Sequence, residues 1–199
     1  MKLKKNHPYL FQFIAPVYGW FFKSQQQRYK KDLELIMKKT ILSNSKSIID
    51  IGCGTGALAS ALTEYGFQTT GMDPVLGMLR IAKKKTKNQN ISFIQGNILN
   101  SVSINDNTFD VSVASYVAHG LKQQDRIIMY KEMKRITKQK VIFFEYNQNR
   151  NIFSDIIEFI EGGDYFKYIK NVESELKDNF SKLTILPLSK RGSLYICEI

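Results

Sequence analysis

The stretch of sequence that decides the fold runs Ser47-Ile48-Ile49-Asp50-Ile51-Gly52-Cys53-Gly54-Thr55-Gly56. A β-branched run, typical of a buried strand, reaches Asp50, and three glycines follow at alternate positions. The alanine- and leucine-rich segment Ala57-Leu58-Ala59-Ser60-Ala61-Leu62 then predicts a helix. In such a strand–turn–helix unit, a ligand can lie against backbone N–H groups at the positive end of the helix. The glycines permit positive φ angles and keep Cβ atoms out of the ligand's place.

A second acidic residue follows the turn at the spacing of a nucleoside site. The segment 67–72 predicts the next strand, and Asp73 ends it. It comes about 20 residues after the first glycine, where nucleoside-binding βαβ units place the acid that accepts the ribose hydroxyls. A second interpretation makes Asp73 the N-cap of the next helix, with Pro74 in the first turn. Both interpretations stay open at this point.

The glycine pattern alone does not distinguish the ligand, because Gly52-x-Gly54-x-x-Ala57 also fits the dinucleotide fingerprint. Asp50 favours a different ligand. A carboxylate beside the turn would repel a pyrophosphate and attract a cation. S-adenosylmethionine (SAM) has an adenosine, no phosphate, a sulfonium and an amino group. The sequence therefore predicts SAM in preference to NAD.

The same stretch resembles the first motif of the class I, Rossmann-like, SAM-dependent methyltransferases, Asp-x-Gly-x-Gly-x-Gly, and every position of that motif is present. Three further segments fit the family: 71–74, 96–98 and 109–111. The resemblance implies an α/β fold, with a single mainly parallel seven-stranded sheet in the order 3-2-1-4-5-7-6, an antiparallel strand 7 and helices on both faces. The ligand would then lie across the carboxyl ends of strands 1, 2 and 4.

Hydrophobic periodicity predicts elements along the rest of the chain. Strands are expected over 91–95, 109–115 and 140–146, and a closing antiparallel hairpin over 183–188 and 193–199. Helices are expected over 25–39, 57–65, from Pro74 onward, and over 123–137, 152–160 and 165–180. Their inward residues are predicted to include Leu33, Ile36, Met37, Val75, Leu76, Met78, Leu79, Ile81, Ile127, Ile128, Tyr130, Met133 and Ile136. We predict one domain over 1–199, with 1–40 as an N-terminal helical lid or cap.

The resemblance also implies which residues hold the cofactor. The glycines approach the methionine and ribose portions, and Asp73 accepts the ribose hydroxyls. Asn97 stands where the family often has Asp, beside the adenine amino group, and an Asn carbonyl can accept the same hydrogen bond. Met78 and Ile98 would sandwich the adenine, although both could equally be core. The full predicted set is Asp50, Gly52, Cys53, Gly54, Gly56, Asp73, Pro74, Met78, Gly96, Asn97, Ile98 and Ser115.

Candidate catalytic residues follow the fourth and fifth predicted strands. A base is needed only when the acceptor carries a proton that must leave, because the sulfonium is already activated. His119 has a side chain suited to that task, but it could also cap the next helix. Tyr116 and Tyr146 are further candidates, with pocket wall as the alternative.

Two observations bear on the acceptor. The sequence has no Asn/Asp-Pro-Pro-Tyr after strand four and no Pro-Cys nucleophile, the signatures of enzymes that methylate exocyclic amines and cytosine C5. The aromatic segment 13–21 looks like the N-terminal segment of the quinone-type and related small-molecule methyltransferases, which closes over the pocket. Gly19 stands where those enzymes often have Asp, so the resemblance assigns it no direct role. Packing on the sheet is the alternative for these aromatics.

Composition sets wider bounds. The net charge of +11 over 199 residues could indicate nucleic acid, but the basic residues are mostly lysines spread along helices, and base readout favours arginine. The two cysteines, Cys53 and Cys197, and the two histidines have no metal-ligand spacing, so we expect reduced thiols and no metal. The apolar start after Lys2, Lys4 and Lys5 lacks a signal-peptide cleavage site.

The sequence therefore predicts a cytoplasmic SAM-dependent methyltransferase that acts on a small, apolar or aromatic acceptor. An RNA methyltransferase and a non-catalytic SAM-binding protein are the alternatives, and the oligomeric state is left undetermined.

Overall fold

The computed structural model describes residues 19–100, 102–147 and 164–199. The seven strands follow the order β3-β2-β1-β4-β5-β7-β6, which confirms the predicted fold class. The chain divides into two compact units, Met1–Asn97 and Ile98–Ile199. The predicted helix over 152–160 and most of the aromatic N-terminal segment lie outside the described residues.

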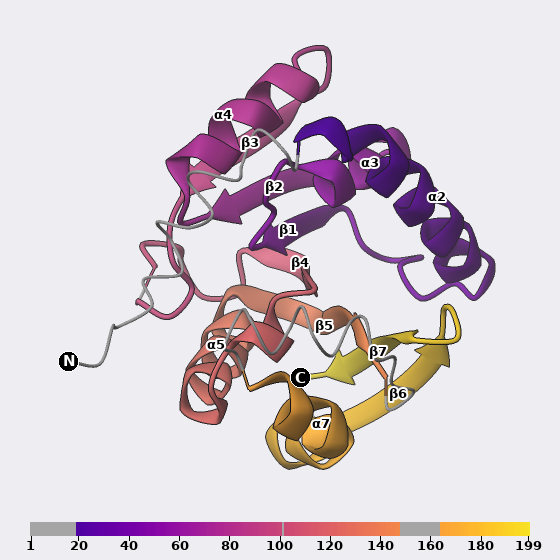
Figure 1. Cartoon of the computed structure of the whole chain (residues 1–199), viewed down its shortest axis with the longest axis vertical. Coiled ribbons are helices and arrows are strands. Elements are labelled where there is room, and N and C mark those ends of the chain that lie inside the picture. The colour runs from indigo at the N-terminus through magenta and orange to yellow at the C-terminus, as the bar shows by residue number, and fades with distance from the viewer. Residues whose placement is uncertain (1–18, 101, 148–163) are drawn as a thin grey trace. The chain divides into compact units, whose positions relative to one another are not determined.

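The first unit contains three parallel strands, β1 (Ser47–Ile51), β2 (Gln68–Asp73) and β3 (Ile91–Gln95). The isoleucines of β1 are buried, as a strand covered on both faces requires. Between residues 19 and 97 the unit also has the helices α2 (Phe22–Lys38), α3 (Ala57–Glu64) and α4 (Leu76–Lys85). In Figure 1, α2 runs beside α3, and the Gln26 amide donates to Ser60 Oγ at 2.7 Å.

The second unit begins with β4 (Phe109–Ser115), the short 3-10 helix η1 (Ala118–Gly120) and α5 (Gln123–Ile136). It continues through β5 (Thr137–Tyr146), α7 (Tyr165–Asn179), β6 (Lys182–Pro187) and β7 (Gly192–Glu198). β4 and β5 are parallel. β7 is antiparallel to both of its neighbours, β5 and β6, as the hairpin prediction required.

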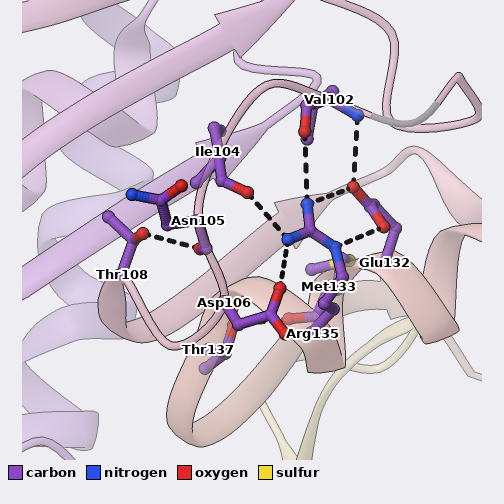
Figure 2. Close-up of polar contacts among 9 residues, drawn as sticks. All are labelled: Val102, Ile104, Asn105, Asp106, Thr108, Glu132, Met133, Arg135 and Thr137. Carbon is purple, nitrogen blue, oxygen red and sulfur yellow. Dashed lines mark hydrogen bonds and ion pairs between the residues drawn. The ribbon is translucent and has the colours of Figure 1, made fainter.

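An arginine on α5 holds the loop that leads into β4 (Figure 2). Arg135 Nη1 donates to the Ile104 carbonyl at 2.7 Å, and Nη2 donates to the Val102 carbonyl at 3.2 Å. The guanidinium also binds the carboxylates of Asp106 and Glu132. Glu132 in turn accepts the Val102 N–H at 3.2 Å. This network fixes the start of β4.

Four predicted inward side chains are exposed instead: Met37, Leu76, Ile127 and Ile128. On α5 the buried positions are Arg126, Met129, Tyr130, Met133 and Ile136. Arg126 faces inward where the apolar pattern predicted Ile127 and Ile128. Its burial is possible because Glu175 on α7 binds the guanidinium through two hydrogen bonds, at 2.6 and 2.9 Å. A charged side chain can be buried when it is paired in this way.

The start of α4 also differs from the prediction. Its N-cap is Val75, so Pro74 precedes the cap and does not occupy the first helical turn. The interpretation of Asp73 as the N-cap is therefore wrong, because the N-cap lies two residues later. Asp73 Oδ1 accepts the Val75 N–H at 2.8 Å in an Asx turn, which delays the helix.

Candidate functional site

The glycine turn between β1 and α3 is shaped by the neighbouring strand. Gly52, Gly54 and Gly56 have φ angles of +69°, +53° and +81°, a region that favours glycine. The N–H groups of Gly52 and Cys53 both donate to the Met72 carbonyl, at 2.8 and 3.0 Å. The end of β2 therefore sets the path of the turn.

The glycines of the first unit serve different purposes. A Cβ built on Gly54 would meet no described heavy atom within 4 Å, so this position faces open space. A Cβ on Gly56 would lie 3.1 Å from Ala82 Cβ and 3.3 Å from the Phe93 ring. Gly56 therefore permits close packing, whereas Gly54 leaves room for a ligand. Gly71 permits packing too, since its Cβ would lie 2.8 Å from Phe93 and 2.9 Å from Cys53 Sγ.

Asp50 is the penultimate residue of β1, just before the glycine turn. Its side chain is buried, and 1% of the residue's surface is exposed. Among the described residues, its Oδ2 atom has no hydrogen-bond partner. Burial raises the pKa of Asp50 to about 8, the nearby Asp73 adds to the rise, and a hydrogen bond with the Ala59 backbone opposes it. A buried, unpaired acceptor costs free energy, so this atom favours a ligand that brings a donor or a positive charge.

Asp73 ends β2 and links the turn to the next helix. Its Oδ2 accepts the Gly54 N–H at 2.9 Å, while Oδ1 is bonded to Val75. Burial raises the pKa of Asp73, and these two hydrogen bonds oppose the rise. A carboxylate offers about four lone-pair sites. The two bonds therefore position the group and leave it the capacity to accept further donors.

Cys53 lies inside the turn as a buried thiol. Burial raises the pKa of Cys53 well above its usual value, and the charges of Asp50 and Asp73 raise it further. Because the nucleophilic form is the thiolate, this side chain acts as an apolar group in the wall of the turn.

The other predicted cofactor residues occupy varied surroundings. Met78 is buried in a small apolar cluster with Val75 and Ile81. This agrees with the alternative that Met78 is a core residue. Pro74 is exposed. Gly96 lies close to the end of β2, because its N–H donates to the Asp73 carbonyl at 3.2 Å. Asn97 is half-buried at the end of the first unit. Ile98, which is buried, and Ser115, which ends β4, belong to the second unit.

The second unit brings together the predicted catalytic side chains. The ring centroids of Tyr116 and Tyr146 lie 4.9 Å apart, and those of His119 and Tyr146 lie 5.0 Å apart. Tyr165, at the start of α7, packs against Tyr146 with centroids 5.3 Å apart. These four residues form what we call the aromatic cluster. Tyr116 has a φ of +54°, which is a strained conformation for a bulky side chain.

A carboxylate whose pairing with His119 was not predicted completes this arrangement. Glu145 Oε2 lies 2.8 Å from His119 Nδ1, and Oε1 accepts the Ala118 N–H at 2.7 Å. None of the Glu145 side chain is exposed, and 9% of the His119 side chain is. The available signal was a glutamate inside the apolar run Val141-Ile142-Phe143-Phe144-Glu145, since an acid in a buried strand needs a partner.

Known proteins resemble this chain in sequence over part of its length. Residues 49–144 match the family model described as a methyltransferase domain. The demethylmenaquinone methyltransferase of Staphylococcus haemolyticus is 29% identical over 150 residues, which are 71% of this chain and 59% of that relative. The chain therefore spans less than two thirds of that relative's length.

Solved structures agree on the fold. The PH0226 protein from Pyrococcus horikoshii superimposes with a TM-score of 0.72 at 20% identity, covering 86% of this chain and 90% of that one. A SAM-dependent methyltransferase from Aquifex aeolicus gives a TM-score of 0.69 at 17% identity, covering 91% and 98%. The sequence-based recognition of the class I, Rossmann-like, SAM-dependent methyltransferase fold is confirmed. The methyl donor of that class is SAM.

Proposed function

We propose that this protein is a SAM-dependent methyltransferase that transfers a methyl group to a small acceptor. The observation that carries the proposal is the pairing of an open position at Gly54 with the unpartnered, buried Oδ2 of Asp50, as seen among the described residues. A ligand that reaches this turn gains most if it is cationic and has no phosphate, and SAM meets both requirements.

The residues of the first unit suit the parts of SAM. The backbone around Gly54 can approach the ligand closely, and Asp73 is held in position to accept ribose hydroxyls. Asp50 would bind the positively charged amino acid end, and Asn97 the adenine amino group. When bound, SAM supplies an electrophilic methyl group on its sulfonium sulfur. The protein then has only to bind the acceptor, orient it and exclude water.

For the acceptor we propose a small apolar or aromatic molecule. The aromatic cluster of the second unit offers ring faces and edges of matching chemistry. The name of the Staphylococcus relative, demethylmenaquinone methyltransferase, points in the same direction. We also keep the proposal of an N-terminal lid over 1–40. RNA is the alternative acceptor, and only the net charge of +11 favours it.

No helix within 19–100, 102–147 and 164–199 is long and apolar enough to cross a membrane. The cytoplasmic location predicted from the sequence stays a prediction.

The test is incubation of the protein with methyl-labelled SAM and either a small-molecule cell extract or total RNA, followed by mass spectrometry. We expect label in a small molecule and formation of S-adenosylhomocysteine. Label in RNA would overturn the proposed acceptor. Tight SAM binding without any labelled product would favour the non-catalytic alternative.

A further inference from the structure

The bond between His119 and Glu145 is more than a buried ion pair, because both carboxylate oxygens are engaged. Oε1 accepts the Ala118 N–H at 2.7 Å and Oε2 faces His119 Nδ1 at 2.8 Å. Ala118 and His119 both belong to η1, which Tyr116 and Val117 link to β4, whereas Glu145 belongs to β5. One carboxylate therefore fixes the backbone and the imidazole of the same short helix.

The contact between Nδ1 and Oε2 favours one position for the proton of the neutral imidazole. We expect Nδ1 to be the donor, because an ionised carboxylate can only accept hydrogen bonds. In the neutral ring the lone pair then belongs to Nε2, the nitrogen that can take up a proton. A negative charge beside Nδ1 also stabilises the imidazolium that forms when Nε2 is protonated. This is how a carboxylate prepares a histidine to act as a base.

The surroundings of His119 are aromatic. The ring centroids of Tyr146, Tyr165 and Tyr116 lie 5.0, 6.2 and 6.3 Å from that of the imidazole, all in edge-to-face arrangements. These phenols and Glu145 are among the titratable groups that lie against His119 in the described part of the chain. The strained φ of Tyr116 is maintained although its cost is about 1–3 kcal/mol. Such strain is found where a side chain must be held in one position.

We propose that His119, positioned by Glu145, is the general base that removes a proton from an acidic hydroxyl group of the acceptor, a phenol or an enol. This inference rests on the proposed methyltransferase function and names its substrate class. The acceptor O–H bond breaks, its proton goes to Nε2, and its electron pair remains on the acceptor. The acceptor then gains the methyl group, the donor sulfur keeps the electron pair of the S–C bond, and His119 later releases its proton to solvent.

An acidic hydroxyl explains the base better than an amine does. A neutral amine attacks with its own lone pair and loses its proton only afterwards. A phenol or enol is a weak nucleophile until it is deprotonated, so a base placed at the acceptor contributes directly to the rate, typically by about 10²–10⁴-fold. Glu145 does not touch the acceptor in this scheme and is a positioning residue.

The first arm of the test is NMR of the ring nitrogens of His119 in the protein without SAM. The chain has two histidines, so His7→Gln assigns the signals. We expect wild-type His119 to carry its proton on Nδ1. In Glu145→Gln, a single amide oxygen must serve both Ala118 and the ring, so the tautomer should shift toward Nε2–H. Glu198→Gln, which removes an exposed carboxylate, should change nothing. Wild-type His119 protonated on Nε2 alone would overturn the proposal, whatever the variants do.

The second arm uses 4-nitrophenol, whose ionisation changes its colour. We expect wild-type protein to convert the bound probe to phenolate at a pH where the free probe is mainly neutral. His119→Gln should abolish that signal and Glu145→Gln should reduce it, whereas Glu198→Gln, which removes an exposed carboxylate, should keep it. A signal that is absent, or independent of His119, would overturn the acceptor class. SAM is not needed in either arm, so failure of the proposed function would appear separately, as absent SAM binding.

Discussion

Asp50 is a carboxyl group whose charge depends on what binds beside it. Its pKa is raised to about 8 by burial and by Asp73. At pH 7 most ligand-free molecules therefore carry a proton on Asp50, whereas a bound cation favours the ionised form. The binding of a cationic ligand should release that proton.

This coupling gives a pH dependence with a definite sign. Below a pKa of about 8, SAM affinity should rise with pH, by up to about tenfold per unit, because binding requires the ionised form that becomes more abundant. Calorimetry at pH 7 in two buffers of different ionisation enthalpy should show proton release. Asp50→Asn keeps the shape and removes the charge, and it should show weaker binding with less proton release. Equal release by the variant and the wild type would remove Asp50 from the site.

Two glycines form a matched pair for testing the turn. Gly54 and Gly66 both have positive φ, and a Cβ on either would meet nothing within 4 Å in the described structure. Because both positions have positive φ, an alanine at either should cost about 1–2 kcal/mol of folding free energy. Gly54→Ala should also abolish SAM binding by placing a methyl group where the ligand lies, while Gly66→Ala should bind normally. Equal affinities, measured by calorimetry with melting temperatures as control, would argue against the turn as the binding site.

At the scale of single residues, the sequence reveals some roles and hides others. The glycine spacing and Asp73 predicted a site because fixed spacing reflects a local strand–turn–helix geometry. The pairing of Glu145 with His119 was not predicted, because the two residues lie on different elements and only folding brings them together. The different purposes of Gly54 and Gly56 also depend on remote neighbours such as Phe93.

Among the helices and strands, prediction succeeded where the pattern was local and continuous. The bounds of β3 and β4 agree with the sequence-based expectation, and the hairpin of β6 and β7 was expected to within a residue or two. Helix faces were less predictable. The inward face of α5 includes Arg126, whose burial depends on Glu175 in α7, and no local pattern on α5 reveals that partner.

The Arg126–Glu175 pair joins α5 to α7, with 2% and 4% of the two side chains exposed. Arg126→Met should cost about 3–5 kcal/mol of folding free energy, because it leaves a charged Glu175 buried without its partner. Adding Glu175→Gln should recover much of that loss, since the neutral amide can still bond to the Tyr130 hydroxyl. Urea unfolding measures both. As a control, Lys182→Met breaks an exposed pair and should cost less than about 1 kcal/mol. A double variant as unstable as the single one would contradict this account.

The N-terminal lid can be followed through Trp20, the single tryptophan of the chain. Trp20 is 82% exposed, and its neighbour Phe21 is also exposed, whereas Phe22 packs in the core. If the segment closes over the acceptor, the emission of Trp20 should shift to shorter wavelength when SAM and acceptor are both added. Trp20→Phe should then lower turnover without changing SAM affinity by more than about twofold. Unchanged emission together with full activity of the variant would leave the segment without a lid role.

For the whole molecule, the two units carry separable parts of the proposed chemistry. The first unit holds the glycine turn, Asp50 and Asp73, and the second holds the His119–Glu145 pair with its aromatic cluster. The fold class was predictable from sequence because local patterns show strands and helices alternating along the chain. Parallel strands are connected by helices in such βαβ units. The acceptor was not predictable, because the residues proposed to contact it come together only through folding.

The central claim is that the first unit binds SAM, and calorimetric titration tests it most directly. Wild-type protein should bind SAM and S-adenosylhomocysteine saturably with one site each, should not bind NAD, and should lose SAM binding on Gly54→Ala. Saturable binding of NAD with no response to SAM would contradict the account.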